Sequence, residues 1–145
     1  LHEKVGVEIA ERRDDGFGGL ARLRQHHALA LRRGQQLQHQ RRTADEIDLP
    51  VITHVQETRL QVVTGQQLYG KTLVEHLHAL GFMKPKTTLI HTVWLNPREI
   101  EMIATTGATA QHNPWSNLML GSGVAPVRAL LDAGVPAAQI ASEIV

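Results

Sequence analysis

The sequence contains no cysteine, which excludes disulfide bonds and thiolate metal ligands. A bound metal ion must therefore take its ligands from histidine, aspartate or glutamate. No apolar run approaches the roughly 20 residues of a membrane span. The N-terminus also does not have the charged-then-apolar layout of a secretory signal. We expect a cytoplasmic protein with no membrane partner.

The chain also lacks an excess of charge of either sign. Fifteen basic and fourteen acidic residues give a formal net charge of +1, and 42% of the 145 residues are hydrophobic. This composition is typical of a globular domain, or part of one, and not of a disordered chain. Because the whole-chain balance offers phosphates no attraction and few aromatic rings are present for base stacking, we expect no nucleic-acid partner.

Residues 1–47 form an atypical segment that is rich in arginine and glutamine. Between residues 16 and 44 there is no acidic residue, and the six arginines are Arg22, Arg24, Arg32, Arg33, Arg41 and Arg42. Two explanations remain open for this segment. It is either a solvated helix with a linker, or sequence translated out of frame. A local excess of six positive charges also leaves open an arm that binds polyanions through Arg22 to Arg42.

Residues 48–145 alternate between strand and helix patterns. The stretches "LPVITHV" (49–55) and "TTLIHTVWL" (87–95) are apolar on consecutive positions, which predicts strands buried on both faces, and "GATAQHNPWSN" (107–117) predicts a third strand that runs into a loop. Helices are predicted over 65–81, over 96–107 with Asn96 as N-cap, Pro97 at N1 and Glu99 at N3, and over 125–134. The pattern predicts an α/β fold with a parallel sheet, either doubly wound or closed as a barrel.

A histidine stands at the end of each of these three strands. They are His54, His91 and His112. Both candidate architectures place chemistry at the carboxyl ends of their strands. A single histidine there is more often a packed structural residue, but three at equivalent positions indicate a functional site.

Residues 49–135 resemble the second half of a metal-dependent amidohydrolase of the deaminase and chlorohydrolase type, a group with S-adenosylhomocysteine, adenosine-type and guanine deaminases and triazine hydrolases. The matching stretches are "HVQET" for the family's H-x-x-E, "LYGKTLVEHLHALGF", "LIHTVWL" and "HNPWSNLMLGSGVAPVRALLDAGV". The resemblance implies a partial (β/α)₈ TIM-type barrel, with this chain providing roughly strands five to seven and their helices.

The resemblance also implies roles for three residues. His54 matches a ligand of one divalent metal, zinc or alternatively iron. Glu57 matches the carboxylic acid that carries a proton from the attacking water to the leaving amine. His91 matches a histidine that contacts the substrate or the attacking hydroxyl group. Because His54 and Glu57 are an odd number of residues apart, the strand must end at about Val55 for both to face one point.

Other residues are candidates for the substrate pocket. By their place in the resemblance, or beside strand ends, the candidates are Trp94, His112, Asn113, Trp115, Ser116 and Asn117, with Arg59 and Tyr69 as further pocket residues. The tryptophans would wall a planar heterocycle, although ordinary core packing explains them equally well. The loop residues would brace the pocket through hydrogen bonds.

The sequence departs from the family in its metal ligands. It has no H-x-H pair at the end of an apolar strand, and Ser142 stands near the position of the aspartate that ends strand eight. We therefore expect an incomplete metal site in a fragment of a hydrolase that cleaves C–N or related bonds in cyclic substrates, for example by deaminating a purine, pyrimidine or triazine ring. Its partners would be a second copy or the rest of the barrel. The alternative is a non-catalytic module that self-associates or binds polyanions.

Overall fold

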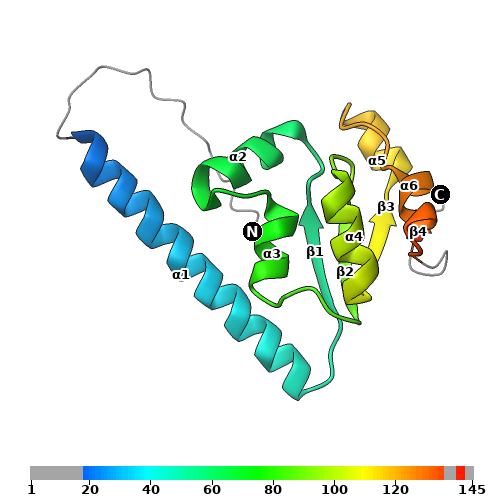
Figure 1. The fold of residues 1–145 in the computed structure, drawn as a ribbon, viewed down its shortest axis with the longest axis horizontal. Helices are drawn as coiled ribbons and strands as arrows, with labels where there is room; N and C mark the ends of the chain where they lie inside the picture. Colours follow the sequence, from blue (N-terminus) through cyan, green and yellow to red (C-terminus); the bar gives the residue numbers. More distant parts are fainter. Residues whose placement is uncertain (1–17, 136–139, 143–145) are drawn as a thin grey trace.

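Four parallel strands form one sheet in the computed structural model, which describes residues 18–135 and 140–142 (Figure 1). The strands are β1 (Val51–Val55), β2 (Thr87–His91), β3 (Thr109–His112) and β4 (Ile140–Ser142), in the spatial order β1-β2-β3-β4. Helices connect each strand to the next, which confirms the predicted α/β class and a partial barrel. The strand β4 adds one strand to the three that the sequence predicted.

Six helices are present among the described residues: α1 (Gly18–Glu46), α2 (Arg59–Tyr69), α3 (Leu73–Ala79), α4 (Pro97–Thr106), α5 (Pro114–Met119) and α6 (Val127–Asp132). The N-terminal cap of α4 is as predicted, since Asn96 and Glu99 form a capping box with Pro97 inside the first turn. The single helix predicted over 65–81 is wrong. Gly70 adopts a left-handed φ of 66° and ends α2, and Thr72 then caps a separate α3.

Helices cover only one face of the sheet. On that face Val55, Leu89 and Ala110 are buried in a core with residues of α3, α4 and α6. On the other face Ile52 is 62% exposed and His54 is exposed. The prediction that the first strand is buried on both faces is therefore wrong, because no described element packs on its second face.

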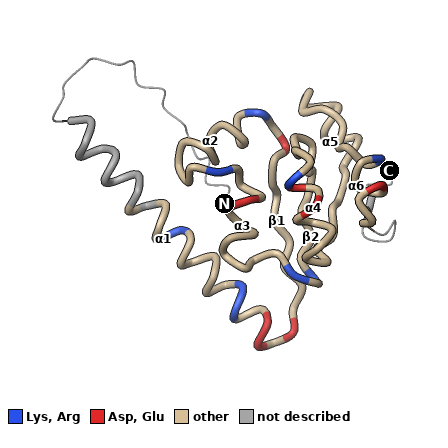
Figure 2. The backbone as a smooth tube through the Cα atoms, viewed as in Figure 1, with Lys and Arg blue, Asp and Glu red and all other residues tan. Residues whose placement is uncertain are grey.

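The helix α1 runs beside the rest of the fold and is fixed at its C-terminal end, where Figure 2 shows charges of both signs. Arg41 is buried, donates a hydrogen bond of 2.9 Å to Thr87 Oγ1 and pairs with Asp45, which also accepts from Lys84 at 2.8 Å. Hydrogen bonds from Arg41 and then Lys84 lower the pKa of Asp45 to about 2. The arginine-rich segment is helical from Gly18 to Glu46.

These contacts also bear on the alternative of polyanion binding. The side chain of Arg41 lies between α1 and β2 and is not accessible to a phosphate.

In the part of the chain that the structure describes, no helix is both long enough and apolar enough to span a membrane.

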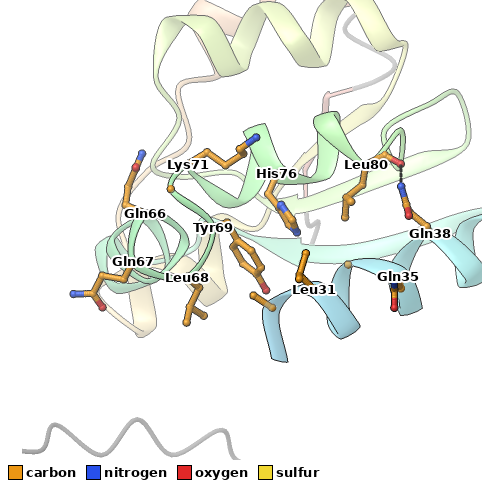
Figure 3. Close-up of a pocket in the computed structure, with 13 residues that line it drawn as sticks. Leu31, Gln35, Gln38, Gln66, Gln67, Leu68, Tyr69, Lys71, His76 and Leu80 are labelled. Carbon is orange, nitrogen blue, oxygen red and sulfur yellow. Dashed lines mark hydrogen bonds between the residues drawn. The ribbon is translucent and has the colours of Figure 1, made fainter. Parts of the chain in front are cut away.

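A cavity of about 600 Å³ separates α1 from α2 and α3 (Figure 3). Tyr69 lies in this cavity and stacks on His76, with 3.8 Å between the ring centroids. The Nε2 atom of His76 is buried and has no hydrogen-bond partner, and an added Cβ on Gly34 of α1 would lie 3.9 Å from it. Tyr69 therefore lines a cavity between α1, α2 and α3, whereas the sequence suggested it as a residue of the substrate pocket.

Two of the helical glycines, Gly34 and Gly65, provide a test of the packing. An added Cβ on Gly65 would lie 2.9 Å from Leu73 N and 3.0 Å from Lys71 O, whereas at Gly34 the nearest atom, Leu80 Cδ2, would be 3.6 Å away. We expect Gly65→Ala to lower the free energy of unfolding by roughly 1–3 kcal/mol through overpacking. Gly34→Ala should raise it by roughly 0.5–1 kcal/mol. Urea unfolding of both variants measures this, and equal effects would contradict the described contact between α2 and α3.

Acid should weaken the packing around His76. Burial lowers the pKa of this ring below 6.5, and the nearby charge of Lys71 adds to the effect. The unfolded chain therefore binds the proton more readily than the folded chain, so stability is full above about pH 6.5 and falls as the pH drops below that value. Urea midpoints at neutral and mildly acidic pH should differ less in His76→Phe than in the wild type, with exposed His78→Phe as the control. An unchanged acid loss in His76→Phe would exclude this origin.

Candidate active site

The chain reverses direction directly after β1. The strand ends at Val55, and Gln56 adopts a left-handed φ of 49° that is uncommon for a residue with a side chain. Gln56 is completely buried, and its side-chain oxygen accepts a hydrogen bond of 3.1 Å from Val74 N while its amide nitrogen donates to Trp94 O. This reversal brings Glu57 back toward the strand ends, although a continuous strand would point it away from His54.

A second reversal ends β2. His91 has a φ of 76° and Thr92 a φ of 47°, so two consecutive residues with side chains have left-handed backbones. His91 is buried, and its ring lies 5.2 Å from the ring of His54 between centroids. Its Nε2 atom lies 3.7 Å from Glu57 Oε2. His54, Glu57 and His91 are therefore grouped at the carboxyl ends of two neighbouring strands, with His91 between the other two.

Asn117 of α5 connects the second and third strand-end histidines. Its Oδ1 atom lies 2.7 Å from His91 Nδ1, and its Nδ2 atom lies 3.2 Å from His112 Nδ1. Asn117 is completely buried. Burial lowers the pKa of His112, and a positive charge on His91 lowers it further, which favours the neutral form of His112. The four side chains form one continuous polar network from Glu57 to His112.

The remaining predicted residues lie around this network. Trp94 donates from Nε1 to Ser122 O at 3.0 Å, and the guanidinium of Arg59 lies 4.8 Å from the centre of its ring. Asn113 precedes α5, and its Oδ1 atom is buried without a hydrogen-bond partner. Ser116 is partly buried in α5. Trp115 is 60% exposed. Among the described residues, the side chains of Asn113, Ser116 and Trp115 form no hydrogen bond with the network.

Two features that contribute to the site, Gln56 and the helix α5, were not predicted from the sequence. Gln56 is one of the unspecified positions in H-x-x-E, so only its place between two functional residues could have drawn attention to it. The helix α5 was expected to be a loop. It has six residues and too few apolar positions for a helical period, and the Asn113-Pro114 pair at its start was the available signal.

The described residues provide only part of a metal site. No group of three or more histidine, aspartate or glutamate side chains within them is arranged to hold a metal ion. A catalytic zinc ion normally has three protein ligands. The imidazole of His54 is exposed on the open face of the sheet and fits the role of one such ligand. It does not complete a coordination shell.

A group of imidazoles and a carboxyl group at the carboxyl ends of parallel strands is the arrangement of a barrel-type hydrolytic enzyme. The sequence profile of the amidohydrolase family matches residues 6–141. The chain therefore belongs to the amidohydrolase family. The match includes most of the arginine-rich segment as well as the strands.

Curated relatives are deaminases of adenosine-type compounds. The chain is 35% identical over 134 residues to the 5-methylthioadenosine/S-adenosylhomocysteine deaminase of Nitratidesulfovibrio vulgaris, which covers 90% of this chain and 30% of the relative. It is 42% identical over 92 residues to the 5'-deoxyadenosine deaminase of Methanothermobacter thermautotrophicus, covering 63% and 22%. The chain thus spans less than a third of the length of these relatives.

Solved structures give the same family relationship. An adenosine deaminase from Xanthomonas campestris with bound zinc superposes with a TM-score of 0.70 at 32% identity, covering 75% of this chain and 24% of that one. An atrazine chlorohydrolase from Arthrobacter aurescens in complex with zinc has a TM-score of 0.67 at 26% identity, covering 76% and 24%. Both neighbours carry zinc.

Replacing Gln56 should destabilise the site and the fold together. Gln56→Leu keeps the bulk of the side chain but leaves Val74 N and Trp94 O without their buried partners, so the free energy of unfolding should fall by on the order of 2 kcal/mol. Urea unfolding measures the loss, and tryptophan fluorescence in a Trp115→Phe background reports the displacement of Trp94. Gln66→Leu at an exposed position of α2 is the matched control. Equal stability of the two variants would contradict the assigned contacts.

Proposed function

We propose that this chain provides the proton-transfer half of a hydrolase that deaminates an amino-substituted heterocycle of the adenosine type. The observation that carries the proposal is the contact between Glu57 and His91 beside the exposed imidazole of His54. The deaminase names of the relatives support the choice of reaction. The atrazine chlorohydrolase among the structural neighbours supports a ring that bears chlorine as an alternative substrate.

In the proposed reaction a water molecule attacks the ring carbon that bears the amino group. Glu57 accepts one proton from the water and passes it to the departing amine, which leaves as ammonia. The second proton of the water moves to a ring nitrogen as the carbon becomes a carbonyl. His91 lies 3.7 Å from Glu57 and holds the carboxyl group at the strand ends. The carboxyl group is mostly shielded from solvent, with 18% of its side chain exposed.

We propose that His54 is one ligand of a divalent metal, with zinc as the first choice because the structural neighbours carry it and iron as the alternative. When bound, such a metal supplies a water molecule whose pKa is lowered toward neutrality. The other ligands and the second half of the pocket would come from further barrel strands. The open face beside Ile52 and the free edge of β1 are where these strands, or a second copy of the chain, would pack.

One wall of the substrate pocket is assigned to the end of β2. A cavity of about 460 Å³ lies beside Trp94 and Arg59, and its other lining residues include Val62, Val63 and Val93. The cation over the ring restricts the orientation of Trp94. The ring of Trp94 and the apolar valine side chains that line this cavity suit a planar heterocycle.

Zinc binding tests the role of His54. The full chain should bind zinc weakly, and His54→Ala should weaken the binding by roughly tenfold or more because an imidazole ligand is lost. Isothermal titration calorimetry measures the affinity, and exposed His78→Ala is the control. Zinc affinity that is insensitive to His54→Ala would remove this histidine from the metal site.

The role of Glu57 is testable as a rate. Residues 49–135 would replace the matching segment of the Xanthomonas campestris adenosine deaminase, and ammonia release from adenosine would be measured. Glu57→Gln keeps the shape of the side chain but removes the proton acceptor, so the rate should fall by about 10²–10⁴-fold. Glu101→Gln at an exposed position of α4 should leave the rate unchanged. A Glu57→Gln chimera at full rate would refute the proposed reaction.

A further inference from the structure

Asn117 lies between imidazoles from two neighbouring strands and contacts both through different atoms of one amide group. The amide oxygen faces Nδ1 of His91 from β2, and the amide nitrogen faces Nδ1 of His112 from β3. The amide is completely buried, so no solvent competes for either contact. A buried amide between two imidazoles must donate to one of them and accept from the other.

The two distances favour one orientation of the amide. A separation of 2.7 Å suits a ring N–H that donates to an oxygen. The separation of 3.2 Å suits an amide N–H that donates to a neutral ring nitrogen. The lowered pKa of His112 agrees with a neutral ring on that side. In the reversed orientation the amide nitrogen would lie 2.7 Å from His91 Nδ1, and the amide oxygen would lie 3.2 Å from His112 Nδ1. His112 would then have to donate from Nδ1 over the longer of the two contacts.

We propose that Asn117 is a positioning residue that fixes the proton of His91 on Nδ1 and the proton of His112 on Nε2. The amide oxygen accepts the Nδ1 proton of His91, and the amide nitrogen donates to the bare Nδ1 of His112. The choice of tautomer at each histidine is thereby set by a side chain outside both strands. This assignment does not depend on a metal, a substrate or turnover.

A consequence follows for Glu57 that rests on the proposed function. With its Nδ1 proton held by Asn117, neutral His91 turns the lone pair of Nε2 toward the carboxyl group 3.7 Å away. Glu57 then takes one proton from the attacking water, as an O–H bond breaks, and gives it to the leaving amine, as an N–H bond forms, beside a ring nitrogen that carries no proton.

The tautomers can be measured directly. The full chain would be labelled with ¹⁵N in its nine histidines, and long-range ¹H–¹⁵N spectra would identify the protonated nitrogen of each ring. Signals are assigned with His91→Gln and His112→Gln. In the wild type at neutral pH we expect Nδ1–H for His91 and Nε2–H for neutral His112. An Nδ1–H signal for His112, or a neutral His91 that carries only Nε2–H, would overturn the proposal without any variant of Asn117.

Two substitutions of Asn117 give opposite expectations. Asn117→Asp offers only acceptor oxygens, so His112 should change to the Nδ1–H tautomer while His91 keeps its Nδ1 proton. Asn117→Leu removes both partners, so both rings should populate mixed tautomers. Asn113→Asp, at the N-cap of α5 and without a hydrogen bond from its side chain in the structure, is the matched control and should change neither ring.

The outcomes separate this proposal from the proposed function. If Asn117→Asp folds and His112 remains Nε2–H, Asn117 does not set the tautomer, whatever the activity. If the tautomers change as expected but the Glu57→Gln chimera keeps its full rate, the positioning role stands and the deaminase proposal fails. If both substitutions at Asn117 prevent folding, the wild-type spectra still decide the assignment.

Discussion

The buried amide of Gln56 is the contact on which the arrangement of the site depends. One side chain joins three parts of the chain: the end of β1, the start of α3 through Val74 N, and the segment after β2 through Trp94 O. Its own carbonyl oxygen also accepts hydrogen bonds from Val93 N and Trp94 N. Because the two strand ends are tied together at this point, Glu57 and His91 meet even though neither would face the other in regular strands.

The same region concentrates unfavourable backbone conformations. Gln56, His91 and Thr92 all have positive φ, and such positions cost on the order of 1–3 kcal/mol each for residues with side chains. The parallel register of β1 and β2 and the buried core beneath them hold these conformations in place. Strain of this kind gathers where side chains must be redirected, and here it redirects an imidazole and a carboxyl group toward one point. If either turn had an ordinary backbone conformation, the sheet would remain but His54, Glu57 and His91 would no longer lie together.

The sequence predicted the outline of this site but not its internal connections. Histidines at strand ends and the H-x-x-E spacing are visible because they recur at fixed places relative to apolar runs. The capping box at Asn96 was found because helix starts have strong local signals. The role of Gln56, the break between α2 and α3 and the helix α5 were missed, since each depends on a long-range partner or on too few residues to show a period. The exposure of Ile52 was missed because an apolar run does not reveal which of its faces will be covered.

The three histidines have different surroundings, and this difference suits different tasks. His54 is exposed at the edge strand, so its nitrogen atoms are free to bind a group brought by the solvent or by further strands. His91 and His112 both contact Asn117, which restricts the rotation of both rings. A histidine that binds a metal needs a ring nitrogen that the metal can reach, whereas a histidine that directs a proton needs one ring nitrogen held in a fixed place. The rim of the sheet offers an exposed imidazole on β1 and two imidazoles on β2 and β3 that contact one amide.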